Sequence, residues 1–109
     1  MPLIVDGMNV IGSRPDGWWR DRRAAHRRLV TALGALGDPV TVVLDGAPHE
    51  IEAPDGVEVV FAPVADDEIA ARAAPGVRVV TSDRGLAERV RAAGGEVEPA
   101  KAFRDRLGD

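Results

Sequence analysis

The sequence predicts an α/β domain in which a parallel sheet lies between two layers of helices. Short runs of β-branched residues alternate along the chain with segments of helical periodicity. These runs are nearly continuously apolar, as in strands that are covered by helices on both faces. Alternation of strands and helices favours a parallel sheet with right-handed crossovers. At 109 residues, the chain is expected to form a single domain, residues 1–109.

About five strands are expected in this sheet. The first four runs are rich in Val and Ile, and the fifth is a short run near the C-terminus. Their expected ranges are 3–5, 40–44, 57–61, 77–80 and 96–98. The segment 46–56 contains several Gly and Pro residues and is expected to be mostly turn and loop.

Four helices are expected between and after the strands. The longest has apolar residues at steps of three and four, and Gly37 and Pro39 follow it as stop signals. The third is expected to end at a Gly-Gly pair. The expected ranges are 18–36, 66–73, 84–93 and 100–107.

Composition excludes several classes of protein. The chain has no Cys, so it has no disulfide framework and no thiolate metal site or nucleophile. No apolar run approaches the ~20 residues of a membrane span, and the N-terminus does not read as a signal peptide. These features predict a cytoplasmic protein without a membrane partner.

The net charge of −4 is unevenly distributed. Residues 14–28 contain six Arg and two Asp, so this segment carries +4 and the remainder −8. A negative net charge argues weakly against nucleic acid as a partner, whereas a basic segment favours it. Positive charge is therefore concentrated in one segment of the sequence, and the rest of the chain is acidic.

Three of the expected strands end in an aspartate. The segments LIVDG (3–7), VVLDG (42–46) and VVTSDRG (79–85) place Asp6, Asp45 and Asp83 just past an apolar run. Ligands of parallel α/β sheets bind at the carboxyl ends of the strands. We therefore expect these acids to gather at one edge of the sheet.

The helix expected at 66–73 opens with two further acids, Asp66 and Asp67. Asp66 shares a helix face with Ile69, so it is expected to point inward toward the same edge. Asp67 is rotated by ~100° and is expected at the rim.

Each acid also has an explanation that involves no chemistry. Asp66 can be a first-turn acid favoured by the helix dipole, and both explanations stay open. Asp83 can cap the next helix, a role that Ser82 could also fill. Asp6 can belong to a turn after its strand, and for Asp45 a turn before Gly46 is the preferred explanation.

Taken together, Asp6, Asp66 and Asp83 would repel each other at a partly buried edge. A divalent cation removes that repulsion, and a site made only of oxygen ligands selects Mg²⁺ or Mn²⁺. Asp67 is a further candidate ligand. Such a site is suited to phosphodiester hydrolysis, in which Asn9 could orient the attacking water or hold a carboxylate.

The arginine-rich segment is the candidate for attracting a polyanion to this acidic edge. Arg14, Arg20 and Arg84 are the candidate RNA-binding residues because they lie nearest to the site and guanidinium groups match phosphate geometry. The alternative is a solvated helix face. Trp18 is expected in the core. Trp19 could stack on an unpaired base, although packing is preferred.

Four segments in order resemble the NYN/PIN-like nucleases, and particularly their YacP-like bacterial members. They are LIVDGMNVIG (3–12), ADDEIAAR (65–72), VVTSDRGL (79–86) and VEPAKAFRDRL (97–107). They span nearly the whole chain. The DG-x-N and TSD motifs together are fairly specific for this family, whereas either motif alone is weak evidence. The chain is shorter than YacP-like proteins between the second and fourth strands.

The resemblance implies a three-layer α/β/α sandwich with strand order near 3-2-1-4-5 and a Mg²⁺- or Mn²⁺-dependent endoribonuclease. Asp6 and Asp83 match metal-binding acids, Asp66 matches the helix-opening acid, and Asn9 matches an amide near the scissile phosphate. Asp45 matches an acid without a firm role, and the family does not fill the Asp67 position with acid consistently. RNA, ribosome-associated RNA included, is the implied partner. A homodimer is compatible with so small a domain, without a specific signal.

Two other functions remain open. The same fold could form an RNA- or protein-binding module that does not cleave, which the negative net charge favours. A Mg²⁺-binding phospho-receiver also places acids at strand ends, but it needs paired acids after the first strand. Here the pair is at 66–67 and the only Lys is Lys101, so this function ranks low.

Overall fold

A computed structural model describes residues 2–108 and contains one five-stranded sheet, in which all neighbouring strands are parallel. The strand order is β3-β2-β1-β4-β5, so the predicted architecture and order are confirmed. The strands are β1 (Leu3–Asp6), β2 (Val40–Asp45), β3 (Val57–Ala62), β4 (Arg78–Val80) and β5 (Glu96–Glu98).

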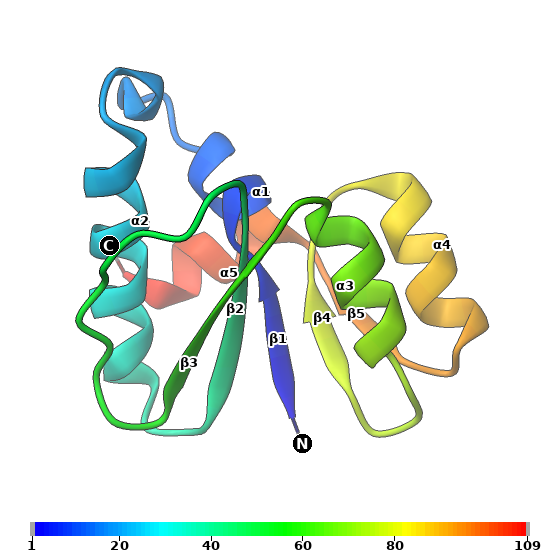
Figure 1. The fold of residues 1–109 in the computed structure, drawn as a ribbon. Coiled ribbons are helices and arrows are strands. Elements are labelled where there is room, and N and C mark those ends of the chain that lie inside the picture. Colours follow the sequence, from blue (N-terminus) through cyan, green and yellow to red (C-terminus); the bar gives the residue numbers. More distant parts are fainter. Residues whose placement is uncertain (1, 109) are drawn as a thin grey trace.

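Helices cover both faces of the sheet (Figure 1). They are α1 (Gly7–Gly12), α2 (Arg22–Leu33), α3 (Ala65–Arg72), α4 (Arg84–Ala92) and α5 (Ala100–Leu107). Two 3₁₀ turns flank α2, namely η1 (Trp18–Arg20) and η2 (Gly34–Leu36). No helix within residues 2–108 is both long enough and apolar enough to cross a membrane.

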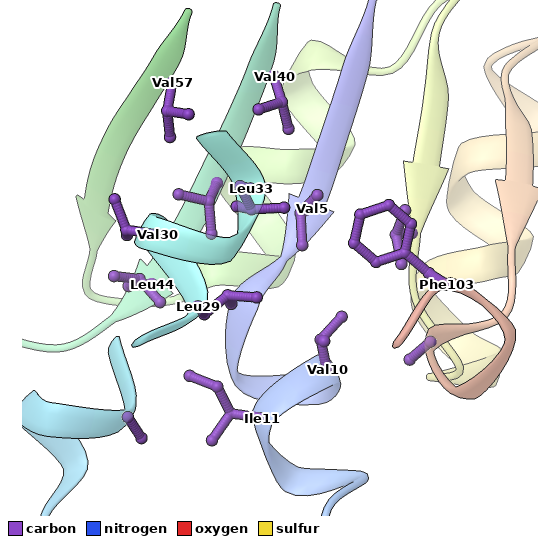
Figure 2. Packing of buried hydrophobic residues seen from close by; sticks show 14 residues of the cluster. Val5, Val10, Ile11, Leu29, Val30, Leu33, Val40, Leu44, Val57 and Phe103 are labelled. Carbon is purple, nitrogen blue, oxygen red and sulfur yellow. The ribbon is translucent and has the colours of Figure 1, made fainter. Parts of the chain in front are cut away.

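Neighbouring residues of each strand pack into different cores. Val5 faces α1, α2 and α5 in one cluster that includes Leu29 and Phe103 (Figure 2). Ile4 faces the other way, into a cluster with Ile69 of α3 and Leu86 of α4. Successive side chains of a strand point to opposite faces, so nearly continuous apolar runs are the result of burial on both sides.

The predicted helix 18–36 is wrong as one element. The backbone is interrupted at Asp21, which has φ −149° and whose side chain accepts a hydrogen bond from Ala24 N at 3.0 Å. That carboxylate caps the N-terminus of α2. The Trp18–Arg20 turn is therefore separate from α2.

The helix α1 was not predicted, because residues 7–12 read as a loop after the first strand. It has only six residues and a Gly at each end. Gly7 does not have a positive φ, so the backbone conformation at this position does not require Gly. Gly7 is needed for space instead, since a Cβ there would lie 2.5 Å from Leu44 Cδ2 and 3.0 Å from Val43 O.

Gly7→Ala should therefore destabilise the protein by ~1–3 kcal/mol, because β2 backbone and a buried Leu would have to move. Gly12→Ala is the matched control, since its Cβ would meet only the Trp18 ring, at 3.9 Å. Alanine is the better helix former by about 1 kcal/mol, so this control should be neutral or stabilising. Urea denaturation measures both, and equal midpoints for the two variants would contradict the packing explanation.

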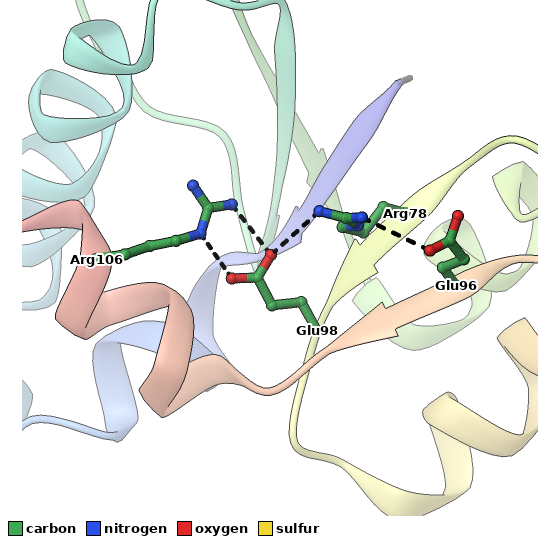
Figure 3. Close-up of polar contacts among 4 residues, drawn as sticks. All are labelled: Arg78, Glu96, Glu98 and Arg106. Carbon is green, nitrogen blue, oxygen red and sulfur yellow. Dashed lines mark hydrogen bonds and ion pairs between the residues drawn. The ribbon is translucent and has the colours of Figure 1, made fainter.

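Ion pairs attach α5 to the sheet (Figure 3). Glu98 accepts hydrogen bonds from Arg106 Nε at 2.7 Å and Nη2 at 3.0 Å. Arg78 lies 3.9 Å from Glu98 and 3.6 Å from Glu96. These contacts connect α5 with β4 and β5, and so help to place the first turn of α5 at the carboxyl ends of the strands.

Candidate active site

The direction in which successive strands are added to the sheet reverses between β1 and β4. The chain moves from β1 to β2 and β3 on one side, and then crosses back to β4 and β5 on the other. Such a switch point opens a crevice outside the carboxyl ends of the two strands. Asp6 is the last residue of β1, and residues 81–83 directly follow β4.

Asp6 is buried at this switch point, with 4% of its surface exposed. Its Oδ2 accepts a hydrogen bond of 2.9 Å from the Thr81 hydroxyl, which also accepts one of 3.1 Å from Asp83 N. Thr81 is almost fully buried. One hydroxyl therefore connects the acid after β1 to the turn after β4.

Burial raises the pKa of Asp6 from an ordinary value near 3.8 to about 6. The Thr81 hydrogen bond opposes this rise, and the negative charges of Asp66 and Asp45 add to it. The backbone N–H of Asn9 lowers the pKa, so α1 also stabilises the carboxylate. Asp6 therefore interacts electrostatically with two of the other acids that the sequence singled out.

Thr81→Val should destabilise the protein by ~1–3 kcal/mol at about pH 7, because Asp83 N loses its hydroxyl acceptor and the buried Asp6 carboxylate loses a donor. Thr41→Val is the matched control, since Thr41 donates to an exposed carboxylate, that of Glu58, at 3.0 Å. It should change stability by less than about 0.5 kcal/mol. Chemical denaturation distinguishes the two, and a neutral Thr81→Val would exclude the proposed role of the hydroxyl.

Asp83 is the N-cap of α4, since its Oδ1 accepts from Leu86 N at 2.9 Å. The alternative cap, Ser82, has another role: its hydroxyl accepts from Ala100 N, in the first turn of α5, at 2.9 Å. Asp83 nevertheless contributes charge to the site, because it raises the pKa of Asp66.

Asp66 lies in the first turn of α3 and is partly buried. Burial raises its pKa, followed by repulsion from Asp83 and Asp45, while Arg89 opposes the rise. Asp66 is not the helix cap, because the N-cap residue is Val64 and the Ala65 N–H is bound elsewhere. Its expected inward position is consistent with these electrostatic contacts.

The sequence favours a turn role for Asp45, but this acid also interacts with the other acids of the site. It precedes Gly46, which has φ +106°, so a turn does follow it. Its Oδ1 also accepts from Ala65 N at 2.9 Å and caps α3 from twenty residues away. Its charge raises the pKa of both Asp6 and Asp66. The Asp-Gly ending that LIVDG (3–7) and VVLDG (42–46) share was the signal that pointed to it.

Asp67 is exposed at the rim, where it forms an ion pair of 2.9 Å with Arg89 Nη1 of α4. Asn9 lies on α1, and its Oδ1 accepts from Ser82 N at 2.7 Å. The Asn9 side chain thus holds α1 against the turn after β4. Within residues 2–108, no three His, Cys, Asp or Glu side chains form a group that could hold a metal ion.

The candidate RNA-binding arginines lie in different surroundings. Arg14 is partly buried and its backbone N–H donates to Ile11 O at 3.1 Å. Arg20 is exposed, with its guanidinium carbon 5.9 Å from the centre of the Trp19 ring. Arg84 is the exposed first residue of α4 and lines a cavity of about 530 Å³ with Arg91.

Two histidines without a predicted role meet on the α2 side of the sheet. His26 Nδ1 lies 2.9 Å from His49 Nε2, and His26 Nε2 lies 3.2 Å from Met8 Sδ. Burial lowers the pKa of His26, and the neighbouring His49 and two arginines lower it further. This pair connects the 46–56 loop and α1 to α2.

A further cavity lies away from the acids. It has a volume of about 780 Å³ and lies at the amino ends of the strands, where Pro2, Pro39 and Arg72 are among its lining residues. Its charged lining residues, Glu58 and Arg72, form an ion pair of 3.5 Å with each other, whereas buried acids with raised pKa values are the better marker of a functional site. The crevice at the opposite edge remains the candidate active site.

Sequence comparison finds no matching family model and no matching curated protein. The solved structure of Rae1 (YacP) from Bacillus subtilis does match, with a TM-score of 0.81 and 24% identity over 98% of this chain and 73% of that chain. A mutant of Rae1 matches with a TM-score of 0.77 and the same identity, over 98% and 74% of the two chains.

This chain has the YacP fold. The structural match covers nearly all of it and agrees with the observed strand order. The resemblance of the sequence motifs to YacP-like proteins is therefore confirmed at the level of the fold. In this strand order, Asp6 follows β1 and Asp83 follows β4, on either side of the switch point.

Proposed function

We propose that this protein is a metal-dependent endoribonuclease that hydrolyses RNA phosphodiester bonds at the carboxyl edge of its sheet. One observation carries the proposal: four acids from different parts of the chain act on each other electrostatically at the switch point. Their interactions raise the pKa of Asp6 and of Asp66. Such shifts are typical of functional sites.

The donor set fits a hard cation such as Mg²⁺ or Mn²⁺. The side chains at the crevice offer carboxylate and amide oxygens, with no Cys in the chain and with both His elsewhere. Since no three acids among residues 2–108 are grouped as ligands, one or two of Asp6, Asp66 and Asp83 would bind the ion directly, with Asp67 as a further carboxylate at the rim. Mg²⁺ often uses only one or two carboxylates and completes its shell with water and substrate phosphate.

A bound ion would polarise the phosphate and increase the acidity of a nearby water. The chain's own residues would position the reactants. Asn9 and Thr81 hold Asp6 and the 81–83 turn in place through hydrogen bonds. Arg84, at the start of α4, would contact a phosphate of the RNA, as would Arg14 and Arg20.

RNA as the substrate is supported by the YacP fold and by the sequence motifs that resemble YacP-like ribonucleases. The basic segment 14–28 follows α1 in sequence. Its positive charge would attract RNA toward the acidic crevice. Ribosome-associated RNA is included among the proposed partners. The proposal requires neither a membrane nor a second copy of the chain.

A non-catalytic RNA- or protein-binding module is the second candidate. The observation that favours it is that two of the acids have structural uses, because Asp83 caps α4 and Asp45 caps α3. Salt-dependent RNA binding without metal-dependent cleavage would be its expected behaviour.

Incubation of the purified protein with labelled RNA and Mn²⁺ tests the first candidate. Wild-type protein should cleave, and Asp66→Asn should reduce the rate by about 10³-fold or more, since a metal ion contributes several kcal/mol to such reactions. Asp38→Asn is the matched control, because this exposed acid lies just before β2 at the opposite edge. Equal rates for wild type and Asp66→Asn would contradict the proposal.

A further inference from the structure

Trp19 is a prominent exposed apolar side chain. Its exposed fraction is 56%, and Val64 is the other exposed large hydrophobic residue within residues 2–108. Trp18, by contrast, packs against the core with α1 and α2. The prediction of a core role is therefore confirmed for Trp18, whereas the preferred packing role for Trp19 is wrong.

The exposed indole of Trp19 contacts the Trp18 ring and lies near the Arg20 guanidinium. Its ring meets that of Trp18 edge-on, with centroids 5.9 Å apart and an interplanar angle of 86°. Arg22 lies over the Trp18 ring at 5.3 Å, and Arg20 lies 5.9 Å from the Trp19 centroid. The result is a flat aromatic face beside a cation, which matches a nucleobase and its phosphate.

The surrounding charge favours a polyanion. The two acids of segment 14–28 are both engaged, because Asp21 caps α2 and Asp16 lies 3.7 Å from Arg28. None of the ion pairs among residues 2–108 involves the other arginines of η1 and α2, which are Arg20, Arg22, Arg23 and Arg27. This surface is positive in a protein of net charge −4.

A groove follows α1, the helix that lies in sequence between Asp6 and this surface. It has a volume of about 440 Å³, lies between α1 and the start of α5, and is lined by residues that include Asn9, Ser82, Gly12 and Lys101. Asn9 and Ser82 adjoin the acids, whereas Gly12 lies at the other end of α1, where a Cβ would be 3.9 Å from the Trp18 ring. In Figure 1, the segment after α1 stands at the same end of the molecule as the carboxyl end of β1.

We infer that Trp19 and Arg20 form a second RNA-binding site, in which Trp19 stacks on an unpaired base and Arg20 contacts the adjoining phosphate. The strand then follows the groove past Lys101 to the carboxylates. Stacking on a ring face requires a base that is not paired, so the ligand is single-stranded RNA or an unpaired loop. This inference rests on the proposed function and specifies its substrate.

Fluorescence anisotropy with a short labelled RNA in EDTA tests binding separately from cleavage. Wild-type protein should bind the single strand more tightly than the same sequence in a duplex. Trp19→Ala should weaken single-strand binding by about tenfold or more, and Trp19→Phe should recover most of it. Lys101→Ala should weaken binding severalfold, whereas Arg72→Ala, which removes the same charge near the opposite edge, should not.

Equal affinities of wild type and Trp19→Ala, or equal binding of duplex and single strand, would overturn the inference. A protein partner at Trp19 in place of RNA would give the first of these results. A parallel cleavage assay with Mn²⁺ separates this failure from failure of the proposed function. Trp19-dependent binding without cleavage would support the inference and reject the nuclease, whereas cleavage that is unaffected by Trp19→Ala would do the reverse.

Discussion

Asp6→Asn is expected to abolish RNA cleavage and, at the same time, to make the folded protein more stable. The loss of activity should reach about 10³-fold or more, because the substitution removes a proposed metal ligand and a charge that the reaction uses. The gain in stability follows from the cost of keeping this carboxylate ionised in a buried position beside other acids.

The sign of the stability effect follows from the pKa. The pKa of Asp6 is about 6 in the folded state and near 3.8 in an ordinary environment. Between these values the folded protein binds more protons than the unfolded chain, so stability falls as the pH rises from about 4 to about 6. Above pH 6 the full cost is present, at about 3 kcal/mol for a shift of about two pKa units.

At about pH 7.5, Asp6→Asn should therefore gain ~1–3 kcal/mol, less than the full amount because the new amide also needs a hydrogen-bond partner. Below about pH 4 the two proteins should have nearly equal stability. Urea denaturation at both pH values measures the difference, with Asp38→Asn as a control that should change little at either. A destabilised Asp6→Asn at about pH 7.5 would show that the buried charge is already compensated within the protein.

Strand positions could be predicted closely from the sequence, because burial on both faces leaves continuous Val and Ile runs. The expected 3–5 and 40–44 each extend by one residue, to Asp6 and to Asp45. Helix α1 could not be predicted in the same way. A helix of six residues has too few turns for a periodic signal, and such helices are stabilised mainly by tertiary packing.

Within the site, the local sequence pattern predicted the positions of the acids, but it did not predict their hydrogen-bond partners. Asp6, Asp66 and Asp83 were found because each stands at the border of a strand or helix. The bond between Thr81 and Asp6 spans 75 positions in sequence, and nothing near either residue predicts it. The same holds for His26 and His49, whose contact depends on the path of the 46–56 loop.

Mn²⁺ should stabilise the folded protein against heat or urea far more at about pH 7.5 than at about pH 5. Metal ligands must be deprotonated, and the pKa of Asp6 near 6, with the raised pKa of Asp66, makes protons strong competitors below neutrality. Each proton displaced weakens apparent metal affinity by up to about tenfold per pH unit in that range. Cleavage at limiting Mn²⁺ should accordingly rise with pH through about 6.

The size of the effect depends on occupancy, since a ligand at a hundred times its dissociation constant stabilises a protein by about 2.7 kcal/mol. Unfolding curves with Mn²⁺, with Mg²⁺ and with EDTA at several pH values measure it without any need for activity. Asp38→Asn should behave like wild type, and Asp6→Asn should respond weakly at every pH. If Mn²⁺ stabilises Asp6→Asn as much as wild type, the ion binds away from the switch point, and the acids there then serve only to cap helices and hold the turn after β4.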